Sequence, residues 1–413
     1  MSRKVVVTGM GVMSCISFDV DQFWEKLLNG VSGVKMISRF ETDGLATRFA
    51  GEIMDFDPAD FMDKKQSNRM DLFDQYAMAA AQCAIRMSGL DDEKLPEELR
   101  ENTAVIVGSG MGGMKTYYDN CIRFFEKGAK KVKPTFIPGV LTDMASGRIA
   151  TRYGFMGMNY SISSACATGS HTIMTAFDAI KLGRCDIAIA GGAESGVNPI
   201  GIAGFNACKA LSVDNENFST ASKPFDVNRA GFIIGEGAGI LVLESEESAK
   251  KRGATIYGEL VGAGASCDAY DDVKPRVDAK GVELSMKRAL KSAELDASEL
   301  SYINTHGTST PAGDVVECQG VARVLGAAKD NVIINSTKSL IGHTLGAAGG
   351  IEAIVALKSL IDQKVHVSAN IKEVAPEIEL SVALETQDRK MDYALSNSFG
   401  FGGHNCSLIF KKV

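Results

Sequence analysis

Short runs of β-branched and aliphatic residues recur along the chain, and they predict buried strands. The runs are Val5–Thr8, Ala104–Val107, Asn159–Ser163, Ile187–Ala190, Ile240–Glu244, Ile333–Ser336 and Cys406–Phe410. Segments with helical patterns lie between many of them, at Met70–Ser88, His171–Leu182, Ser245–Arg252 and Thr344–Asp362. The first three of these helices stop at a glycine, a common C-terminal signal. The alternation predicts an α/β protein with a mostly parallel sheet or sheets.

One order of elements occurs twice. Strand, small-residue turn, helix and strand follow one another between residues 104 and 189, and again between residues 301 and 363. A duplicated α/β core would explain this repetition. The second half begins near Ile256, and no Pro-rich or low-complexity linker precedes it. We therefore expect an N-terminal half over residues 1–253 and a C-terminal half over residues 254–413, packed as one compact unit.

The composition is that of an ordinary globular protein. Of the 413 residues 45% are hydrophobic and 23% are charged, and the formal net charge is −7. The negative charge argues against nucleic acid as a partner. The nine cysteines include no CxxC pair, so most of them fit small buried side chains in a reducing compartment, with no zinc site. No apolar run approaches the ~18 residues that a membrane span needs.

Cys166 lies in the run Ser163–Ser170, where an extended stretch gives way to a helix. A thiol at a helix N-terminus sits beside the positive end of the helix dipole, which favours the thiolate. Small neighbours leave room for a substrate carbonyl. The sequence therefore predicts a nucleophile with a lowered thiol pKa, although the commoner role of a cysteine is that of a small buried hydrophobe.

Two of the five histidines, His306 and His343, lie in turns rich in small residues. Each turn follows a predicted strand, as the Cys166 turn does, and such strand ends meet at one edge of an open α/β sheet. A thiol with two imidazoles is a nucleophilic constellation. A structural histidine is the commoner alternative, and it is the interpretation we prefer for His171 and His366.

The turn Gly108–Gly113 fits the pattern GxGxxG and follows a strand, which allows a dinucleotide-binding interpretation. No clean βαβ unit with an acidic residue at the end of its second strand follows, so an NAD enzyme is a weak alternative. Close backbone packing explains the same glycines.

The three turns that carry Cys166, His306 and His343, in this order, resemble those of the elongating β-ketoacyl-[acyl-carrier-protein] synthases, type II more than type I. The likeness spans nearly the whole chain and includes Val5–Gly11, Gly191–Glu194, Lys223–Asp226, Gly235–Gly239 and Asn397–Gly403. It implies a thiolase-like fold, with a duplicated βαβαβαββ core in a layered α-β-α-β-α arrangement, and a homodimer. It also implies a cytoplasmic location, or the plastid stroma for a mature organellar form. One departure is His404, where many bacterial relatives have Thr and plant plastid members often have His.

The resemblance assigns roles residue by residue. Cys166 matches the acylated nucleophile, His306 and His343 the catalytic histidine pair, and Lys338 the lysine that supports the pair. Phe401 matches the gating phenylalanine, with Phe399 beside it, and its backbone N–H would form an oxyanion hole with that of Cys166. Met111 matches a position in the acyl pocket. No cofactor is required, but the family can hold Na⁺ or K⁺, for which the matching positions are Asn304, Glu352, Ser396 and Asn397.

The implied reaction is a decarboxylative Claisen condensation. Cys166 takes an acyl group from the phosphopantetheine thioester of an acyl carrier protein, and malonyl-carrier protein then loses CO₂ and attacks it, giving 3-oxoacyl-carrier protein. His343 stands where thiolases use a second cysteine, which favours decarboxylation over thiolysis. The carrier protein is acidic, so a basic docking surface is expected. Its candidates are Lys64, Lys65, Arg69, Lys130, Lys131 and Lys209.

Two alternatives stay within the same fold: a polyketide-type ketosynthase and a non-catalytic chain-length partner. Such partners lose the nucleophile, so the presence of Cys166, His306, His343 and Lys338 argues against the second.

Overall fold

The structure is a computed structural model that describes residues 3–92 and 94–413. Residues 1 and 2, the start of the predicted N-terminal half, and residue 93 lie outside the described residues. Among the helices of the two described ranges, none has the length and apolarity to cross a membrane.

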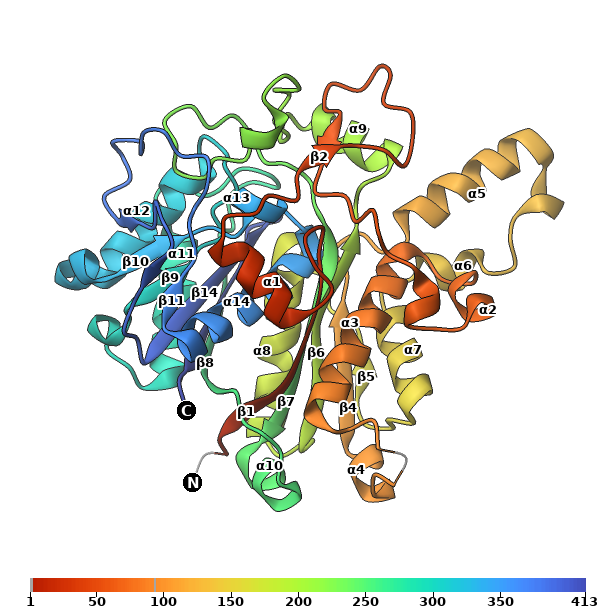
Figure 1. Cartoon of the computed structure of the whole chain (residues 1–413), viewed down its shortest axis with the longest axis horizontal. Coiled ribbons are helices and arrows are strands. Elements are labelled where there is room, and N and C mark those ends of the chain that lie inside the picture. Colours follow the sequence, from red (N-terminus) through yellow and green to blue (C-terminus); the bar gives the residue numbers. More distant parts are fainter. Residues whose placement is uncertain (1–2, 93) are drawn as a thin grey trace.

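One large sheet runs through the middle of the molecule (Figure 1). Within the described residues its eleven strands follow the order β12 (Ser381–Val382), β10 (Ile333–Asn335), β9 (Tyr302–Asn304), β14 (Tyr393–Gly400), β15 (His404–Lys411), β8 (Gly258–Cys267), β1 (Val5–Met13), β7 (Glu236–Ser245), β6 (Ile187–Ser195), β4 (Thr103–Gly108) and β5 (Asn159–Tyr160). Two small ribbons lie outside it: β2 (Lys35–Met36) pairs with β3 (Phe49–Ala50), and β11 (Lys364–Val365) pairs with β13 (Gln387–Asp388). Each of the predicted strands is present.

The sheet contains two copies of one topology. The spatial order β1, β7, β6, β4, β5 of the first copy matches the order β8, β15, β14, β9, β10 of the second. Apart from additional helices and the short strands β2, β3, β11, β12 and β13, each copy runs along the chain as the predicted βαβαβαββ core. The copies join where β1 pairs with β8, with Val5 opposite Leu260. The duplication expected from the sequence is therefore confirmed.

The sheet is mixed, so the prediction of a mostly parallel sheet is wrong at its centre. β4 is parallel to β5 and β6, and β9 is parallel to β10 and β14. β7 is antiparallel to both β6 and β1, and β15 is antiparallel to both β14 and β8. The cause is that the last two strands of each copy are antiparallel neighbours, which need no crossover helix.

Helices form three layers around the two copies (Figure 1). α3 (Leu72–Ser88) and α7 (Met144–Tyr153) cover the outer face of the first copy, and α11 (Lys280–Ala293) with α12 (Gly313–Leu325) covers that of the second. α8 (Thr168–Lys181) and α14 (Ala348–Asp362) lie between the copies and contact strands of both. The layers therefore follow the expected order α-β-α-β-α.

The remaining helices lie at the rims of these layers. They are α1 (Val20–Leu28), α2 (Lys64–Ser67), α4 (Glu97–Glu101), α5 (Met114–Lys127), α6 (Phe136–Val140), α9 (Pro199–Ala207), α10 (Glu246–Arg252) and α13 (Lys338–Ile341). Short 3₁₀ turns are η1 (Pro58–Asp60), η2 (Ala129–Lys131), η3 (Ala165–Ala167), η4 (Phe218–Thr220), η5 (Ala297–Glu299), η6 (Gly326–Asn331) and η7 (Leu345–Ala347). Among these, η3 and η7 lead directly into the two central helices.

The two central helices approach each other closely because glycines line their contact. A Cβ at Gly169 of α8 would lie 2.6 Å from the backbone nitrogen of Gly350 in α14. A Cβ at Gly349 would lie 2.3 Å from Ser170 Oγ. The side chains of α14 from Ala348 to Leu360 are all buried, as expected for a helix enclosed between two sheets. This packing fixes the positions of the turns at the N-termini of both helices.

Candidate active site

The three turns singled out in the sequence meet in one cavity. Cys166, His306 and His343 line a cavity of about 300 Å³, together with Phe399 and Phe401. The turns arrive from η3, from the end of β9 and from the segment between α13 and η7. They come together because they lie at the same edge of the two sheet copies.

Cys166 is the middle residue of η3 and is 8% exposed. The preceding residue, Ala165, has a φ of 50°, a left-handed conformation that is rare for residues other than glycine. Gly400 packs against this turn, and a Cβ there would lie 3.0 Å from the backbone nitrogen of Cys166. The backbone N–H groups of Phe401 and Cys166 both favour the thiolate form of this thiol. They are the pair expected to form the oxyanion hole.

The expected lowering of the Cys166 pKa is not found. Burial raises the pKa of the Cys166 thiol to about 12, and the nearby carboxylate of Glu194 acts in the same direction. The charge of Lys338 and the two backbone N–H groups lower the pKa, but they do not outweigh burial. The sequence pattern located the helix N-terminus correctly, but it could not reveal how fully the pocket encloses the sulfur.

His343 is held by the backbone around it. The backbone N–H of His343 donates to the carbonyl of Ile233 at 2.7 Å, and the backbone N–H of Leu345 donates to the ring Nδ1 of His343 at 3.3 Å. Because Nδ1 accepts this hydrogen bond, the ring proton of the neutral imidazole lies on Nε2. Burial and the charge of Lys338 hold the pKa of His343 well below 6.5, so the ring is neutral at physiological pH.

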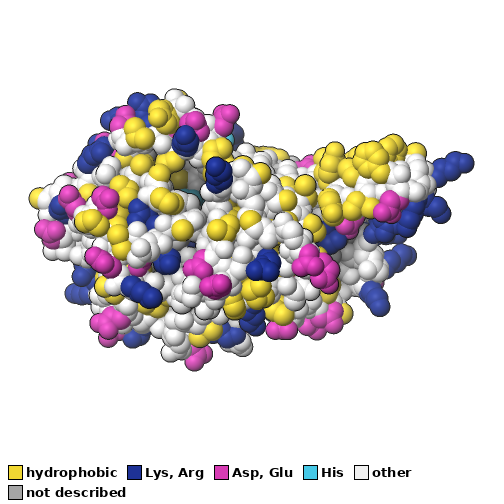
Figure 2. Space-filling view, turned by 90° about the horizontal axis from the view of Figure 1, so that it is seen from above, with side chains coloured by type: hydrophobic (Ala, Val, Ile, Leu, Met, Phe, Trp, Pro, Cys, Tyr) yellow, Lys and Arg dark blue, Asp and Glu magenta, His cyan; other side chains and the backbone are white. Residues whose placement is uncertain are grey.

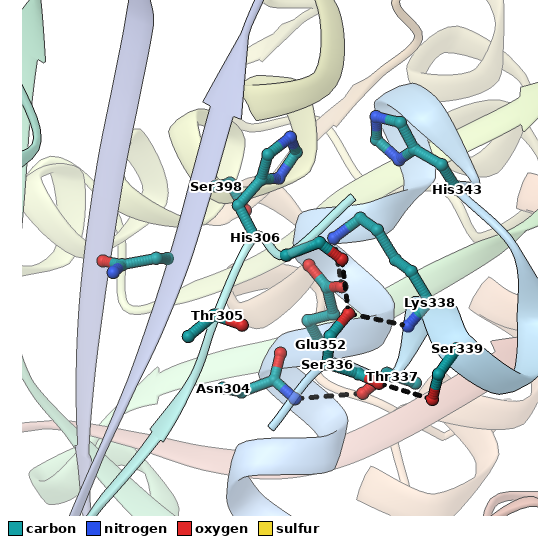
Figure 3. A network of polar contacts seen from close by, with 12 residues as sticks. Asn304, Thr305, His306, Ser336, Thr337, Lys338, Ser339, His343, Glu352 and Ser398 are labelled. Carbon is teal, nitrogen blue, oxygen red and sulfur yellow. Dashed lines mark hydrogen bonds and ion pairs between the residues drawn. The ribbon is translucent and has the colours of Figure 1, made fainter. Parts of the chain in front are cut away.

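His306 lies at the start of the loop that follows β9. Its ring centroid is 5.1 Å from that of His343, at an interplanar angle of 85°, and both rings lie on the same side of Lys338 (Figure 3). Burial, followed by the charge of Lys338 and by the repulsion that a protonated His343 would exert, holds the pKa of His306 well below 6.5. The site therefore contains two neutral imidazoles side by side.

Lys338 begins α13 and is 2% exposed. It forms an ion pair with Glu352 of α14, which is also buried (Figure 3). Burial raises the pKa of Glu352 to about 7, and the lysine charge opposes this shift. The charge of Lys338 lowers the pKa of both imidazoles.

The two phenylalanines and Met111 also lie at the site. Phe399 contacts the ring of His306, with centroids 5.8 Å apart, and Phe401 lies 6.4 Å from the ring of Phe205. Met111 packs in the same apolar cluster as Cys166, Phe232 and Leu345. An apolar lining next to the nucleophile suits an acyl chain.

The turn Gly108–Gly113 holds a carboxylate of the protein itself. The N–H groups of Gly110 and Met111 donate to Glu194 at 2.8 and 3.3 Å, and the hydroxyl of Ser109 donates at 2.7 Å. The side chain of Glu194 occupies the space that a dinucleotide phosphate would need. The alternative of an NAD enzyme therefore finds no support at this turn.

Three of the four residues expected to bind a cation have an oxygen without a hydrogen-bond partner among the described residues, and the fourth, Asn397, does not. The three oxygens, Asn304 Oδ1, Glu352 Oε2 and Ser396 Oγ, are buried. Asn304 and Ser396 are direct neighbours in the pairing of β9 with β14. The side chain of Asn397 is engaged elsewhere, since its Oδ1 accepts from Ser407 and its amide donates to Glu317. Unpartnered oxygens of this kind fit a monovalent cation.

The candidate docking residues are exposed but lie in different places. Lys209 follows α9 and lines the mouth of the active-site cavity. Lys64, Lys65 and Arg69 lie in and after α2. Residues 114–140, which include α5, η2 and α6, form an arm, and Lys130 and Lys131 of η2 lie at its far end (Figure 1). Figure 2 shows Lys and Arg side chains gathered at the end of this arm.

Two acidic residues of the site were not given a role from the sequence. Glu317 of α12 accepts hydrogen bonds from the N–H groups of His306 and Gly307, both at 2.8 Å, and so fixes the His306 loop. Asp314, also in α12, accepts from the N–H of Ser309 at 3.1 Å. Their spacing after the His306 turn is the only signal in the sequence, and it cannot reveal that the helix folds back against that turn.

Two family models match the chain. Beta-ketoacyl synthase, N-terminal domain, covers residues 2–249, and Beta-ketoacyl synthase, C-terminal domain, covers residues 257–372. The 3-oxoacyl-[acyl-carrier-protein] synthase 2 of Vibrio harveyi is 44% identical over 413 residues, which is 100% of this chain and 99% of that protein. The chloroplastic 3-oxoacyl-[acyl-carrier-protein] synthase I of Arabidopsis thaliana is 42% identical over 409 residues, 99% of this chain and 86% of that protein.

Solved structures show the same fold. A ketosynthase in complex with a type II polyketide synthase acyl-carrier protein has a TM-score of 0.91 and 30% identity, and the match covers 100% of both chains. The family models and the full-length relatives agree with the geometry of the cavity. This chain belongs to the β-ketoacyl synthase family.

Proposed function

We propose that this chain is a 3-oxoacyl-[acyl-carrier-protein] synthase II-like acyltransferase. It condenses a Cys166-bound acyl chain with malonyl-acyl-carrier protein, releases CO₂ and forms 3-oxoacyl-acyl-carrier protein in fatty-acid elongation. The observation that carries this proposal is a buried thiol and two neutral imidazoles lining one cavity. The names of the Vibrio and Arabidopsis relatives support the same substrate class.

In the first half-reaction the sulfur of Cys166 attacks the thioester carbonyl of acyl-carrier protein. The new bond joins the acyl carbon to Sγ, and the pantetheine thiol leaves with a proton. The N–H groups of Cys166 and Phe401 stabilise the oxyanion, an interaction typically worth ~10²–10³ in rate per donor. Because the free thiol is a weak acid here, its proton must leave as the bond forms, and the neutral imidazole of His306, whose Nδ1 has no hydrogen-bond partner among the described residues, can accept it.

In the second half-reaction malonyl-carrier protein loses CO₂, and the bonding electron pair moves onto the thioester oxygen as an enolate. The Nε2–H of neutral His343 can donate to that oxygen, with His306 beside it. The enolate carbon then attacks the acyl carbonyl on Cys166, whose sulfur leaves as the thiolate. Decarboxylation generates the carbon nucleophile, so no base is needed to remove a proton from carbon.

A second candidate function is that of a polyketide-type ketosynthase, since a solved ketosynthase of that class has the same fold. The two candidates share their chemistry and differ in the acyl chain. The non-catalytic chain-length partner is disfavoured, because Cys166, His306, His343 and Lys338 are all present and the first three line one cavity.

A monovalent cation, Na⁺ or K⁺, would be held by Asn304, Glu352 and Ser396. Their unpartnered oxygens support this assignment. Bound there, the cation would supply a positive charge that stabilises these buried oxygens and the loop before Lys338. Unfolding temperatures that do not differ between potassium chloride and choline chloride would argue against the site.

The homodimer is supported by apolar side chains on the arm. Tyr117, Phe124, Phe125 and Ile137 are exposed, Phe125 to 82%, and Figure 2 shows apolar side chains gathered along the arm. Monomeric proteins rarely expose such contiguous patches. The edge strand β5 adds the exposed ring of Tyr160. We propose that this face meets a second copy of the chain.

Three further assignments accompany the proposal. The halves 1–253 and 254–413 are supported by the separate family models over residues 2–249 and 257–372. The partner is acyl carrier protein, with phosphopantetheine arriving on it. The location is the bacterial cytoplasm or the plastid stroma, as the chloroplastic relative suggests, and fractionation of the source cells tests it.

The proposal is tested by following CO₂ and product together. The purified protein is given an acyl-carrier protein and malonyl-carrier protein labelled at the free carboxyl carbon. We expect labelled CO₂ and an equal amount of 3-oxoacyl-carrier protein. Release of CO₂ without a condensed product, or product without CO₂, would rule the proposed reaction out.

A further inference from the structure

Glu194 is a buried carboxylate that the mechanism above does not use. It lies near the end of β6 and is 0% exposed. Besides the three donors from the turn Gly108–Gly113, it accepts a hydrogen bond from the N–H of Gly346 at 3.0 Å. The carboxylate therefore joins two turns that are more than two hundred residues apart in sequence. The first turn carries Met111, and the second, which contains Gly346, follows His343.

The contact is too close for any side chain on the glycines. A Cβ at Gly110 would lie 2.8 Å from Glu194 Oε2, and a Cβ at Gly346 would lie 2.6 Å from the same oxygen. A Cβ at Gly346 would also lie 2.5 Å from the backbone nitrogen of Gly110. The two turns thus touch each other directly, with the carboxylate at their junction.

The duplication of the core explains why a carboxylate binds there. η3 and η7 are equivalent turns, since each precedes a central helix and each opens on a residue with a φ of 50°, Ala165 and Leu345. The second residue is Cys166 in one turn and Gly346 in the other. The N–H that belongs to the oxyanion hole in the first copy has its counterpart in the Gly346 N–H of the second copy, where Glu194 supplies the negative oxygen.

Glu194 also acts on the nucleophile. The charge of Lys338 lowers the pKa of the Cys166 thiol, whereas the ionised form of Glu194 raises it. Burial raises the pKa of Glu194 to about 7, so this carboxyl is largely ionised at pH 8. Both Met111 and Leu345, the residue before Gly346, pack in the apolar cluster that contains Cys166. A change at Glu194 would therefore be felt by the acyl pocket and by the sulfur together.

We propose that Glu194 is a positioning residue for the condensation, whose buried carboxylate fixes the Met111 turn against the Gly346 turn next to the apolar cluster that contains Cys166. The inference deepens the proposed function and rests on it for the role of Met111. It predicts that shape and charge at this position have separable effects.

Two variants of Glu194 separate the effect of side-chain shape from the effect of charge. Glu194→Gln removes the charge at nearly constant volume, and Glu194→Asp keeps the charge but shortens the side chain. The readout is the rate at which iodoacetamide alkylates Cys166 between pH 7 and 9, measured by mass spectrometry of the Cys166 peptide. The exposed Cys267 in the same samples is the internal control. This readout needs no condensation activity, so it does not depend on whether the proposed reaction is correct.

For Glu194→Gln we expect alkylation of Cys166 at pH 8 to accelerate by about threefold or more, because the carboxylate charge that opposes the thiolate is removed, with Cys267 unchanged. For Glu194→Asp we expect alkylation close to that of the wild-type protein, but an altered ratio of acyl-transfer rates between short and long acyl chains. Should Glu194→Gln not fold, Ser109→Ala removes one donor to the carboxylate and is expected to alter the same chain-length ratio. An unchanged alkylation rate in folded Glu194→Gln, or an unchanged ratio in Glu194→Asp and in Ser109→Ala, would overturn the proposal.

Discussion

At the scale of single residues, the site is built from side chains whose protonation is set by backbone contacts and burial. The Leu345 N–H places the proton of His343 on Nε2, and the enclosed pocket keeps both imidazoles neutral. Neutral imidazoles can donate to an enolate oxygen without the cost of burying a second positive charge next to Lys338. This combination fits decarboxylation better than proton abstraction.

The role of His343 can be separated from that of Cys166. We expect His343→Ala to lower CO₂ release from malonyl-carrier protein by ~10²–10³, the typical cost of one lost donor. Transfer of the acyl group from carrier protein to Cys166 should continue, since that step uses the N–H groups of Cys166 and Phe401. Loss of acyl transfer in a folded His343→Ala protein would contradict this division of labour.

The residues of the site could be predicted from the sequence more fully than their electrostatics. Cys166, His306, His343 and Lys338 each follow a strand in a small-residue turn, and that local pattern is visible in the sequence. The raised pKa of Cys166 was not predictable, because it depends on burial of the sulfur and on the charge of Glu194, which only the folded chain brings about. The hydrogen bonds of Glu317 with the His306 loop could not be predicted for the same reason.

At the scale of elements, glycines decide how closely helices and strands approach. β1 continues through Gly9 and Gly11 to Met13, beyond the predicted Val5–Thr8, because α3 packs directly on it. A Cβ at Gly11 would lie 2.0 Å from the carbonyl oxygen of Ala80. From the sequence these glycines could be taken for the end of a strand. Their function, close contact with a helix, became visible only in the folded chain.

The contact of α14 with β7 gives a test of this packing. A Cβ at Gly350 would lie 2.1 Å from the carbonyl oxygen of Gly239. We expect Gly350→Ala to lower the free energy of unfolding by ~1–3 kcal/mol or more, as overpacking does, measured by denaturant unfolding. The matched control is Gly147→Ala in α7, where no atom lies within 4 Å and where alanine should stabilise by ~0.5–1 kcal/mol. Equal effects of the two changes would contradict the account.

At the scale of the whole molecule, the arm formed by α5 and α6 projects from the two-copy core (Figure 1). Apolar side chains are exposed along the arm and basic ones at its far end (Figure 2), and the edge strand β5 is exposed as well. This arrangement is hard to explain for a monomer, but it fits a dimer in which the arm of one copy reaches over the other.

The dimer can be tested at the most exposed of these rings. We expect Phe125→Asp to shift the molar mass in sedimentation equilibrium from that of a dimer towards that of a monomer, because a charge would replace an apolar ring in the proposed interface. Leu384→Asp, at an exposed apolar residue far from the arm in sequence, is the control. A wild-type protein that sediments as a monomer would exclude the homodimer outright.

Docking of the carrier protein is a second property of the whole surface. We expect charge reversal at Lys130 and Lys131 to raise the KM for acyl-carrier protein and to leave kcat unchanged, with the effect shrinking as salt is added. The matched control is reversal of two exposed lysines on another face, Lys250 and Lys251 of α10. An unchanged KM would remove the end of the arm from the docking surface and leave Lys209 as the candidate at the mouth.

The central claim is that Cys166 carries the acyl chain between the two half-reactions. The most direct measurement is mass spectrometry of peptides after incubation with acyl-carrier protein alone, followed by a chase with malonyl-carrier protein. We predict the mass of one acyl group on the peptide that contains Cys166, its absence in Cys166→Ala, and its loss during the chase as 3-oxoacyl-carrier protein appears. An acyl group on another residue, or full condensation by Cys166→Ala, would contradict the account.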